Sequence, residues 1–398
     1  MPDNGVHLEP GPTIIDPRVV AALSAQPMYH QSPEFAVLAD ETCDLLRSFY
    51  GTSGEVVMLP SSGRGAVEAA LASVDHIGRT LVVPANGTFA RMMATIGRSL
   101  GMHVVELAHR AGQILDRDRI AEEVARHDRP ILGVVHNETS TGMLNPLDGL
   151  AEVVRGRDGL LVVDTVSSLG GTAVEMDRHD IDLCASTTQK AVGAPPGVGF
   201  VALGPRGIAA VESGAEGEGH YLQLRRWWDQ WVPLDRGGRL ASGYRRLPWT
   251  MPTNVVVALH TALRLAAGEH VRGTWERHRR IAEALRAALR CLGASPVAAA
   301  GYESPTVSAF RFGDTDVLQL RRALAHRHGV HIATGMGDEA TTVLRFAHMA
   351  ESARPTPQLL MLTALTYELA RSARCDGDDP AQVFQRFWFA QRPETILA

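Results

Sequence analysis

Residues 185–200 read ASTTQKAVGAPPGVGF, and this stretch contains Lys190, the only lysine among 398 residues. Lysine and arginine together number 39, so the other 38 basic residues are arginine. An arginine guanidinium stays protonated, whereas a lysine amine can lose its proton and attack a carbonyl carbon. The residue types therefore favour a chemical role for Lys190 over a solvated lysine kept by chance.

Seven short apolar segments lie within residues 56–203, and helix-like segments separate most of them. The expected strands are Val56–Leu59, Leu81–Val83, His103–Leu107, Ile131–Val135, Leu160–Val163, Leu183–Ala185 and Gly199–Leu203. The helix-like segments include Ala66–Val74, Arg91–Leu100, Ile120–Arg126 and Leu147–Val154. Fully apolar strands alternating with amphipathic helices indicate an α/β domain whose mostly parallel, seven-stranded sheet is covered by helices.

The chain is longer than the ~250–300 residues at which a single core stops growing. We expect an N-terminal arm over 1–20, a large domain over 21–255, a small C-terminal α+β domain over 256–373 and an aromatic tail over 374–398. Phe384, Phe387, Trp388 and Phe389 in that tail fit one face of a short helix that needs a partner surface.

Composition excludes several function classes. A net charge of −5 offers no electrostatic case for nucleic acid, and no apolar run approaches the ~18–20 residues of a membrane span. The N-terminus lacks the basic and apolar regions of a signal peptide. The four cysteines, Cys43, Cys184, Cys291 and Cys375, show no CxxC spacing, which argues against a disulfide framework or a zinc site. We expect a cytoplasmic protein without a metal site.

The segment PSSGRGA at 60–66 follows the first expected strand and opens a helix. Small residues at a helix N-terminus expose backbone N–H groups and form a ready anion site. A dinucleotide-binding GxGxxG is not completed, because Glu68 stands at its last position, and a P-loop would need a lysine. A phosphate-binding turn is favoured, with a plain tight turn as the alternative.

Asp164 follows the apolar run LLVV, at the carboxyl edge where α/β sheets bind ligands. Alone it could simply cap the next turn. Together, a phosphate-binding helix start, an aspartate at one strand end and one lysine at another suit pyridoxal phosphate (PLP). The lysine would form a Schiff base, and the aspartate would hold a proton on the pyridine nitrogen. Phe89, after the second strand, is a candidate for stacking on the ring, with core packing as its alternative.

Three segments make the sequence resemble the class V aminotransferases, which are PLP enzymes of fold type I. They are HNETSTGMLNPLDG at 136–149, VVDTVSSLGG at 162–171 and TTQKAVGAPPG at 187–197. The resemblance runs from Glu9 to about residue 373. It is greatest to the branch that includes alanine–glyoxylate, serine–pyruvate, pyridoxamine–pyruvate and 2-aminoethylphosphonate aminotransferases.

The resemblance implies a role for each matching position. Lys190 and Asp164 would be catalytic, and Arg345 would bind the substrate α-carboxylate, a task that suits a planar guanidinium. The implied cofactor-binding residues are Ser62, Gly63, Arg64, Phe89, Thr139, Asp164, Val166, Gln189, Lys190 and Thr250. Thr250 would reach the cofactor of a neighbouring subunit, so a homodimer with shared active sites is implied. The tryptophans between 227 and 249 then suggest an apolar dimer interface.

Some positions depart from the family pattern. Phe89 stands where Trp or Tyr is common, Arg64 where a small residue or His is common, and Leu247 where some members have a phosphate-binding Tyr. Arg64 could contact the cofactor phosphate or a second acidic group on the substrate.

The expected activity is transfer of an amino group from a small amino acid to a small 2-oxo acid, pyruvate or glyoxylate. A PLP-dependent lyase or desulfurase, a biosynthetic transaminase with an unusual amine donor, and a non-catalytic binding protein are the alternatives. A desulfurase would need a cysteine on a mobile loop, and no cysteine stands in an obvious one.

Overall fold

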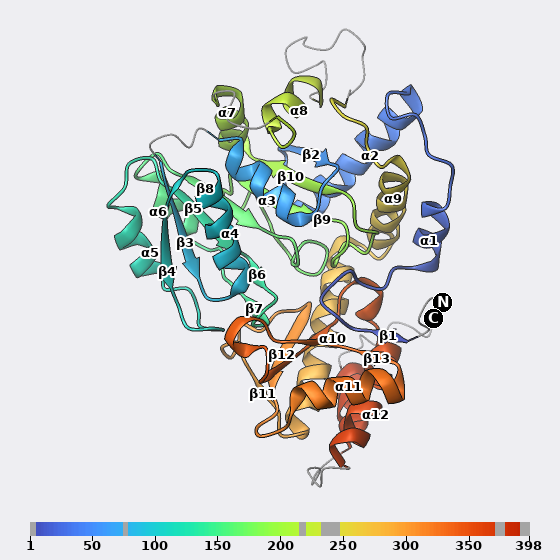
Figure 1. Ribbon diagram of the computed structural model, residues 1–398. Coiled ribbons are helices and arrows are strands. Elements are labelled where there is room, and N and C mark those ends of the chain that lie inside the picture. The colour runs from blue at the N-terminus through green and yellow to red at the C-terminus, as the bar shows by residue number, and fades with distance from the viewer. Residues whose placement is uncertain (1–4, 75–78, 215–219, 232–246, 371–378, 391–398) are drawn as a thin grey trace.

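The computed structural model describes residues 5–74, 79–214, 220–231, 247–370 and 379–390 (Figure 1). Its largest element is a seven-stranded sheet in the order β2-β10-β9-β8-β5-β3-β4. The strands are β2 (Glu55–Leu59), β3 (Thr80–Ala85), β4 (His103–Ala108), β5 (Ile131–Val135), β8 (Leu160–Asp164), β9 (Leu183–Thr187) and β10 (Gly199–Leu203). Strand β10 is antiparallel to β2 and β9, and the other pairs are parallel. The predicted α/β fold with seven strands is confirmed.

Helices pack around this sheet because its central strands are apolar on both faces. All five residues are buried in each of β2, β5, β8, β9 and β10. The surrounding helices are α1 (Pro17–Leu23), α2 (Pro33–Tyr50), α3 (Gly63–Ala72), α4 (Thr88–Ser99), α5 (Arg117–Val124), α6 (Leu150–Arg155), α7 (Pro205–Ser213), α8 (Leu224–Trp231) and α9 (Thr253–Gly268). Trp227 and Trp228 are buried in this core, so packing within the chain accounts for these two tryptophans without a dimer interface.

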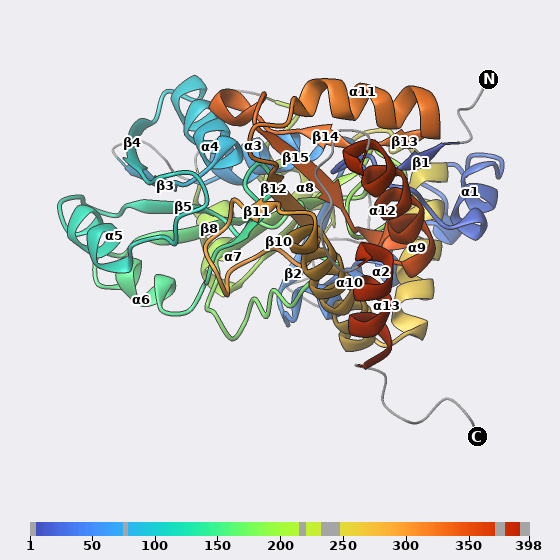
Figure 2. The same cartoon turned by 90° about the horizontal axis from the view of Figure 1, so that it is seen from below.

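A second hydrophobic core lies around a four-stranded antiparallel sheet in the order β11-β12-β15-β14 (Figures 1 and 2). Its strands are β11 (Ser295–Pro296), β12 (Val307–Arg311), β14 (Ala333–Thr334) and β15 (Val343–Ala347). The helices that pack there are α10 (Val271–Cys291), α11 (Val317–His328), α12 (Pro355–Ala370) and α13 (Pro380–Ala390). Short 3-10 turns cover Gly337–Glu339 and Ala350–Ser352, and β6 (Asn137–Glu138) pairs with β7 (Met143–Leu144).

Both ends of the described part of the chain pack against this second core. Helix α13 lies along α10, with Phe384 and Trp388 buried and the Arg280 guanidinium 4.4 Å from the centre of the Trp388 ring. At the other end, β1 (Val6–His7) pairs in parallel with β13 (Val330–His331), and Leu8 is fully buried in the second core. The exact domain boundaries stay a prediction. Within the described parts of the chain, no helix is both long and apolar enough to span a bilayer.

Candidate active site

The carboxyl ends of β5, β8 and β9 meet at one edge of the large sheet because these strands are parallel neighbours. His136 follows β5, Asp164 ends β8, and Lys190 lies three residues beyond β9. The sequence therefore places a titratable group at the end of each strand, and the strand order brings the three ends together.

Asp164 is a buried carboxyl group with one hydrogen bond from the backbone, in which Val166 N donates to Oδ1 over 2.8 Å. Burial raises the pKa of Asp164 to about 7, and the carboxylate of Glu138 adds to the rise, whereas the Val166 hydrogen bond and Lys190 oppose it. A buried carboxyl group with a raised pKa can pair with a cationic ligand atom, whose charge would favour the ionised carboxylate.

Lys190 is half-buried, and its Nζ donates a hydrogen bond to the carbonyl oxygen of Pro10. Burial lowers the pKa of Lys190 to about 8; the nearby Arg345 charge lowers it further, and Asp164 opposes the shift. An amine with this pKa is partly unprotonated near neutral pH, as a nucleophile or a base must be.

The N-terminal arm closes over Lys190 at Gly11. A Cβ added at Gly11 would lie 2.7 Å from Lys190 Nζ, and its φ of +100° is one that other residues rarely adopt. Thr13 N also donates to the carbonyl oxygen of Gln189 over 3.2 Å. These contacts give the expected arm a specific place beside the lysine, which sequence reasoning did not identify.

The predicted anion cradle lies at the start of α3. Ser62 is the N-cap residue, and its side chain accepts a hydrogen bond from Gly65 N over 3.5 Å. A Cβ added at Gly63 would lie 2.8 Å from the Val166 side chain and 3.1 Å from that of Thr187, so only glycine brings the helix start this close to the ends of β8 and β9. The structure thus brings Ser62, Gly63 and Val166 together.

Other predicted residues occupy positions around this cradle. Gln189 is half-buried, and its Oε1 accepts a hydrogen bond from Thr187 Oγ1 over 2.6 Å. Arg64 and Thr250 are exposed, and each belongs to a segment next to the large core. These positions leave the cation of Arg64 and the hydroxyl of Thr250 accessible to a ligand or a second subunit.

Glu138 is a fully buried carboxylate that the sequence interpretation missed as a site residue. Its Oε2 accepts hydrogen bonds from Phe89 N at 2.9 Å and Ala90 N at 3.1 Å, and its Oε1 accepts from Ser140 N and Oγ at 3.1 and 2.6 Å. Burial raises the pKa of Glu138, although these four donors oppose the shift. It caps the first turn of α4, whose N-cap Gly87 has no side chain to do so.

Gly87 shows why this arrangement needs a glycine. A Cβ there would lie 2.2 Å from Glu138 Cγ. The segment Ala85-Asn-Gly-Thr-Phe89 could have pointed to this arrangement. A glycine at the N-cap position supplies no capping side chain, so it leaves room for the side chain of a residue far away in the sequence to cap the helix. Glu138 therefore fixes the backbone at Phe89, the predicted stacking residue.

The apolar residues Leu344 and Phe346 on either side of Arg345 predict a strand end for it, and this prediction is wrong. Arg345 lies at the centre of β15, paired with Ala309 and Ala333. Its Nε donates to Thr334 O over 2.7 Å, and its Nη1 donates to Thr139 O over 3.4 Å. Burial lowers the pKa of Arg345 to about 10, whereas Glu138 raises it. Strand β15 thus places the buried guanidinium of Arg345 next to the loop that contains Thr139.

The family model described as aminotransferase class-V matches residues 9–355. A soluble hydrogenase 42 kDa subunit of Anabaena cylindrica is 31% identical over 88% of this chain and 89% of its own length. The (S)-ureidoglycine–glyoxylate transaminase of Bacillus subtilis is 28% identical over 92% of this chain and 90% of its own. The pyridoxamine–pyruvate transaminase of Mesorhizobium japonicum is 27% identical over 91% of both chains.

The three-dimensional comparison agrees. The crystal structure of the ureidoglycine–glyoxylate aminotransferase from Bacillus subtilis superposes with a TM-score of 0.88 and 26% identity, covering 97% of this chain and 98% of the other. The expected fold type I architecture is confirmed. The chain belongs to the class V aminotransferases, which are PLP-dependent enzymes.

Proposed function

We propose that this enzyme transfers an amino group from a small amino acid to pyruvate or glyoxylate, with Lys190 as its reactive amine. One observation carries the proposal: the only lysine of the chain is half-buried, has a pKa lowered to about 8, and is influenced electrostatically by both Asp164 and Arg345. An amine, an acid and a carboxylate-binding cation are the three groups that amino transfer requires at one site.

The residues present fit PLP. The backbone start of α3 at Ser62 and Gly63, with Arg64 and Gln189 nearby, would hold the phosphate. Asp164 would bind the protonated pyridine nitrogen, and Phe89 and Val166 would lie against the two faces of the ring. Thr139 would contact the ring hydroxyl. When bound, PLP supplies an electron sink for the negative charge that develops at the substrate Cα.

The protein groups have distinct tasks in the transfer. Lys190 Nζ would remove the proton from the substrate Cα and return it to the cofactor side, since its lowered pKa makes both directions accessible. Arg345 would hold the substrate carboxylate and orient Cα, because a guanidinium already anchored by Thr334 O has little freedom left to lose. The arm at Pro10 and Gly11 would limit access of water to Lys190.

The choice of acceptor rests on the relatives. Their names specify glyoxylate for the Bacillus subtilis protein and pyruvate for the Mesorhizobium japonicum protein. A transaminase with an unusual amine donor stays an alternative, because those names also include ureidoglycine and pyridoxamine as donors.

A desulfurase is less well supported by the cysteines. Cys43 and Cys184 are buried in the large core, where burial raises the pKa of Cys184 well above its usual range, and Cys291 ends α10. Cys375 lies outside the described residues.

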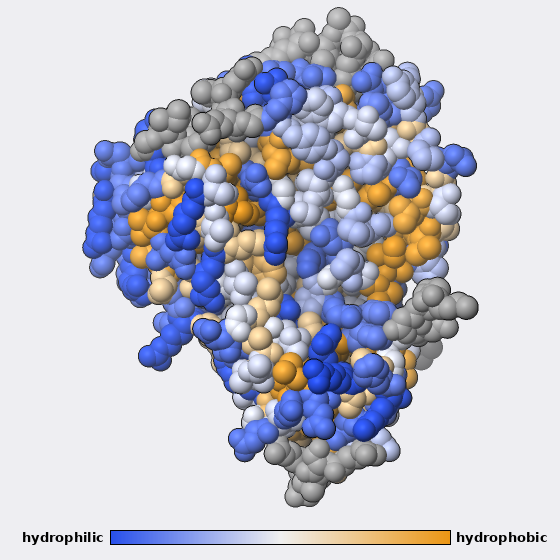
Figure 3. Space-filling view, viewed as in Figure 1, coloured by the Kyte–Doolittle hydropathy of each residue, from blue (hydrophilic) through white to orange (hydrophobic). Residues whose placement is uncertain are grey.

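We further propose a cytoplasmic homodimer in which Thr250 reaches the partner's cofactor phosphate. In support, Thr250 is exposed beside Trp249, whose ring lies 4.6 Å from that of His220 and 5.7 Å from that of Tyr221. Hydrophobic surface is also visible over α1 and α9 (Figure 3), and Val20 is 50% exposed. An active monomer in analytical ultracentrifugation would disprove the shared site.

The single lysine allows a decisive test of the mechanism. Borohydride reduction of the PLP-loaded enzyme, followed by peptide mapping, should place one pyridoxyl group per chain on Lys190. The Lys190→Arg variant keeps the cation but lacks the nucleophile, so it should take no label. Conversion of bound pyridoxal to the pyridoxamine form by one amino acid, with no keto acid present, would then identify the donor. Label at another residue would contradict the proposal.

A further inference from the structure

The N-terminal arm and the second core join through a short parallel ribbon outside the active site. Strand β1 pairs with β13 so that Val6 lies opposite Val330 and His7 opposite His331. Val6 N donates to Gly329 O and Leu8 N donates to His331 O, both over 2.7 Å. The register therefore sets the two histidines side by side.

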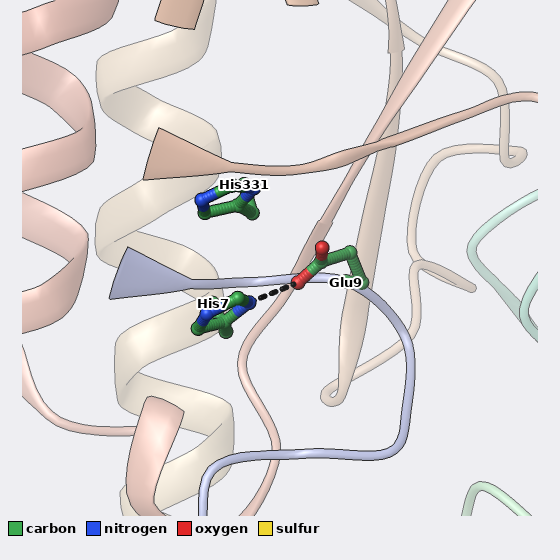
Figure 4. A group of neighbouring side chains, drawn as sticks. All are labelled: His7, Glu9 and His331. Carbon is green, nitrogen blue, oxygen red and sulfur yellow. Dashed lines mark ion pairs between the residues drawn. The ribbon is translucent and has the colours of Figure 1, made fainter. Parts of the chain in front are cut away.

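Glu9 joins this pair because alternate residues of an extended strand share a face. His7 Nδ1 lies 3.4 Å from Glu9 Oε2, and the imidazole rings of His7 and His331 are stacked with centres 4.5 Å apart and planes inclined by 9°. Figure 4 shows the three side chains gathered on one side of the ribbon. One ligand atom from each lies within 4.8 Å of the others.

Two imidazoles and a carboxylate form a set of donors suited to zinc and similar divalent transition metals. An ion bonded at about 2.0–2.2 Å would draw the three donor atoms to roughly 3.4 Å apart. The His7–Glu9 distance already meets this value. The two nearly parallel imidazoles direct their nitrogens side by side, so an ion would require the His7 ring to turn, and its side chain is 39% exposed. The exposed side would leave a fourth position for water.

Gly5 makes room for the cluster. A Cβ added there would lie 2.8 Å from His331 Cδ2 and 2.5 Å from Gly329 O, so a larger residue would displace the imidazole or the strand. The backbone at Gly5 thus leaves space for the His331 imidazole.

We propose that His7, Glu9 and His331 bind one divalent transition-metal ion of the Zn²⁺ type, which fastens the N-terminal arm to the second core. The next residue, Pro10, provides the carbonyl that accepts a hydrogen bond from Lys190 Nζ. Fastening at Glu9 therefore holds in place the part of the arm that covers the reactive amine. Spacing in the sequence could not indicate this site, because 324 residues separate His7 from His331.

Calorimetric titration of Zn²⁺ into chelator-treated, PLP-loaded enzyme tests the proposal directly. We expect one ion per chain, with the affinity reduced at least tenfold in His331→Ala and in Glu9→Gln. His326→Ala, which removes an exposed histidine from α11 outside the cluster, is the matched control and should bind as the wild type does.

Hydrogen exchange supplies a readout that does not depend on activity. Zn²⁺ should slow exchange of the Leu8 and Ala347 amides, which donate to His331 O and Leu8 O, in the wild type but not in Glu9→Gln. Glu9→Gln preserves side-chain size, so it separates loss of metal binding from loss of folding. Equal Zn²⁺ affinity in the wild type and both variants, or unchanged exchange on saturation, would overturn the proposal.

Discussion

Asp164→Asn should stabilise the protein without its cofactor while nearly abolishing its activity. The folded apoprotein holds the Asp164 carboxyl with a pKa raised from 3.8 to about 7, chiefly by burial. A group with a raised pKa keeps its proton longer in the folded than in the unfolded chain. Between these two values the folded state therefore binds more protons, and its stability falls as the pH rises.

The size of the effect follows from the two pKa values. The rise in pKa from 3.8 to about 7 corresponds to a loss of roughly 4 kcal/mol of folding stability at a pH above both values, and roughly half of that loss has developed by about pH 5.5. Asparagine removes the ionisation, but its amide adds a pH-independent cost of about 1–3 kcal/mol if no acceptor is met. The difference in unfolding free energy between variant and wild type should thus grow by about 2 kcal/mol from about pH 5.5 to about pH 8.

Urea denaturation of both apoproteins across this pH range measures the difference, because the constant amide cost cancels. Asp182→Asn is not a suitable control, since Asp182 pairs with Arg155 at 2.9 Å; the exposed Asp118→Asn is preferable. With PLP bound, the wild type should be more stable than Asp164→Asn, because asparagine cannot pair with the pyridinium charge. A stability difference independent of pH would refute the assignment of a raised pKa to Asp164.

Four further predictions concern the predicted reactive amine and the groups around it. Arg345→Lys should raise KM for both the amino acid and the keto acid, by roughly 2–4 kcal/mol of lost binding and orientation, and leave PLP affinity unchanged. Arg64→Ala should instead weaken PLP binding if Arg64 contacts the phosphate, so steady-state kinetics and PLP titration separate the two variants. Selective loss of activity toward an acidic donor in Arg64→Ala would make Arg64 a specificity residue. Glu138→Gln should lower the unfolding free energy by about 1–3 kcal/mol, because its amide N–H groups face backbone donors at Phe89 or Ser140. In the same denaturation assay Glu122→Gln, at an exposed position of α5, should have little effect. The rate at which PLP reconstitutes the apoenzyme should rise with pH through about 8, because the pKa of Lys190 is lowered to that value and only the unprotonated amine attacks. Stopped-flow absorbance measures this rate, and a rate that does not change between about pH 7 and 9 would contradict the prediction.

The sequence alone determined the architecture of the large sheet and predicted which residues are its reactive groups. Uninterrupted apolar runs predict strands that are buried on both faces, and the expected cores of all seven strands lie within the observed ones. Lys190 became a candidate because it is the only lysine of the chain, and Asp164 because it follows an apolar run. Parallel strands bring the carboxyl ends that precede both residues to one edge. Local pattern and strand polarity are properties of short segments, so a single sequence contains them.

The partners of these groups were decided only by the tertiary structure. Pro10 meets Lys190 across 180 residues, and Arg345 meets the carbonyl of Thr139 across 206. Glu138 caps a helix that begins 50 residues before it. Such contacts depend on how separately formed elements pack, and no periodicity in the chain encodes the direction in which a buried side chain finally points. The pKa values of Asp164 and Lys190 also depend on the tertiary structure, since burial within the assembled site is the largest cause of both shifts.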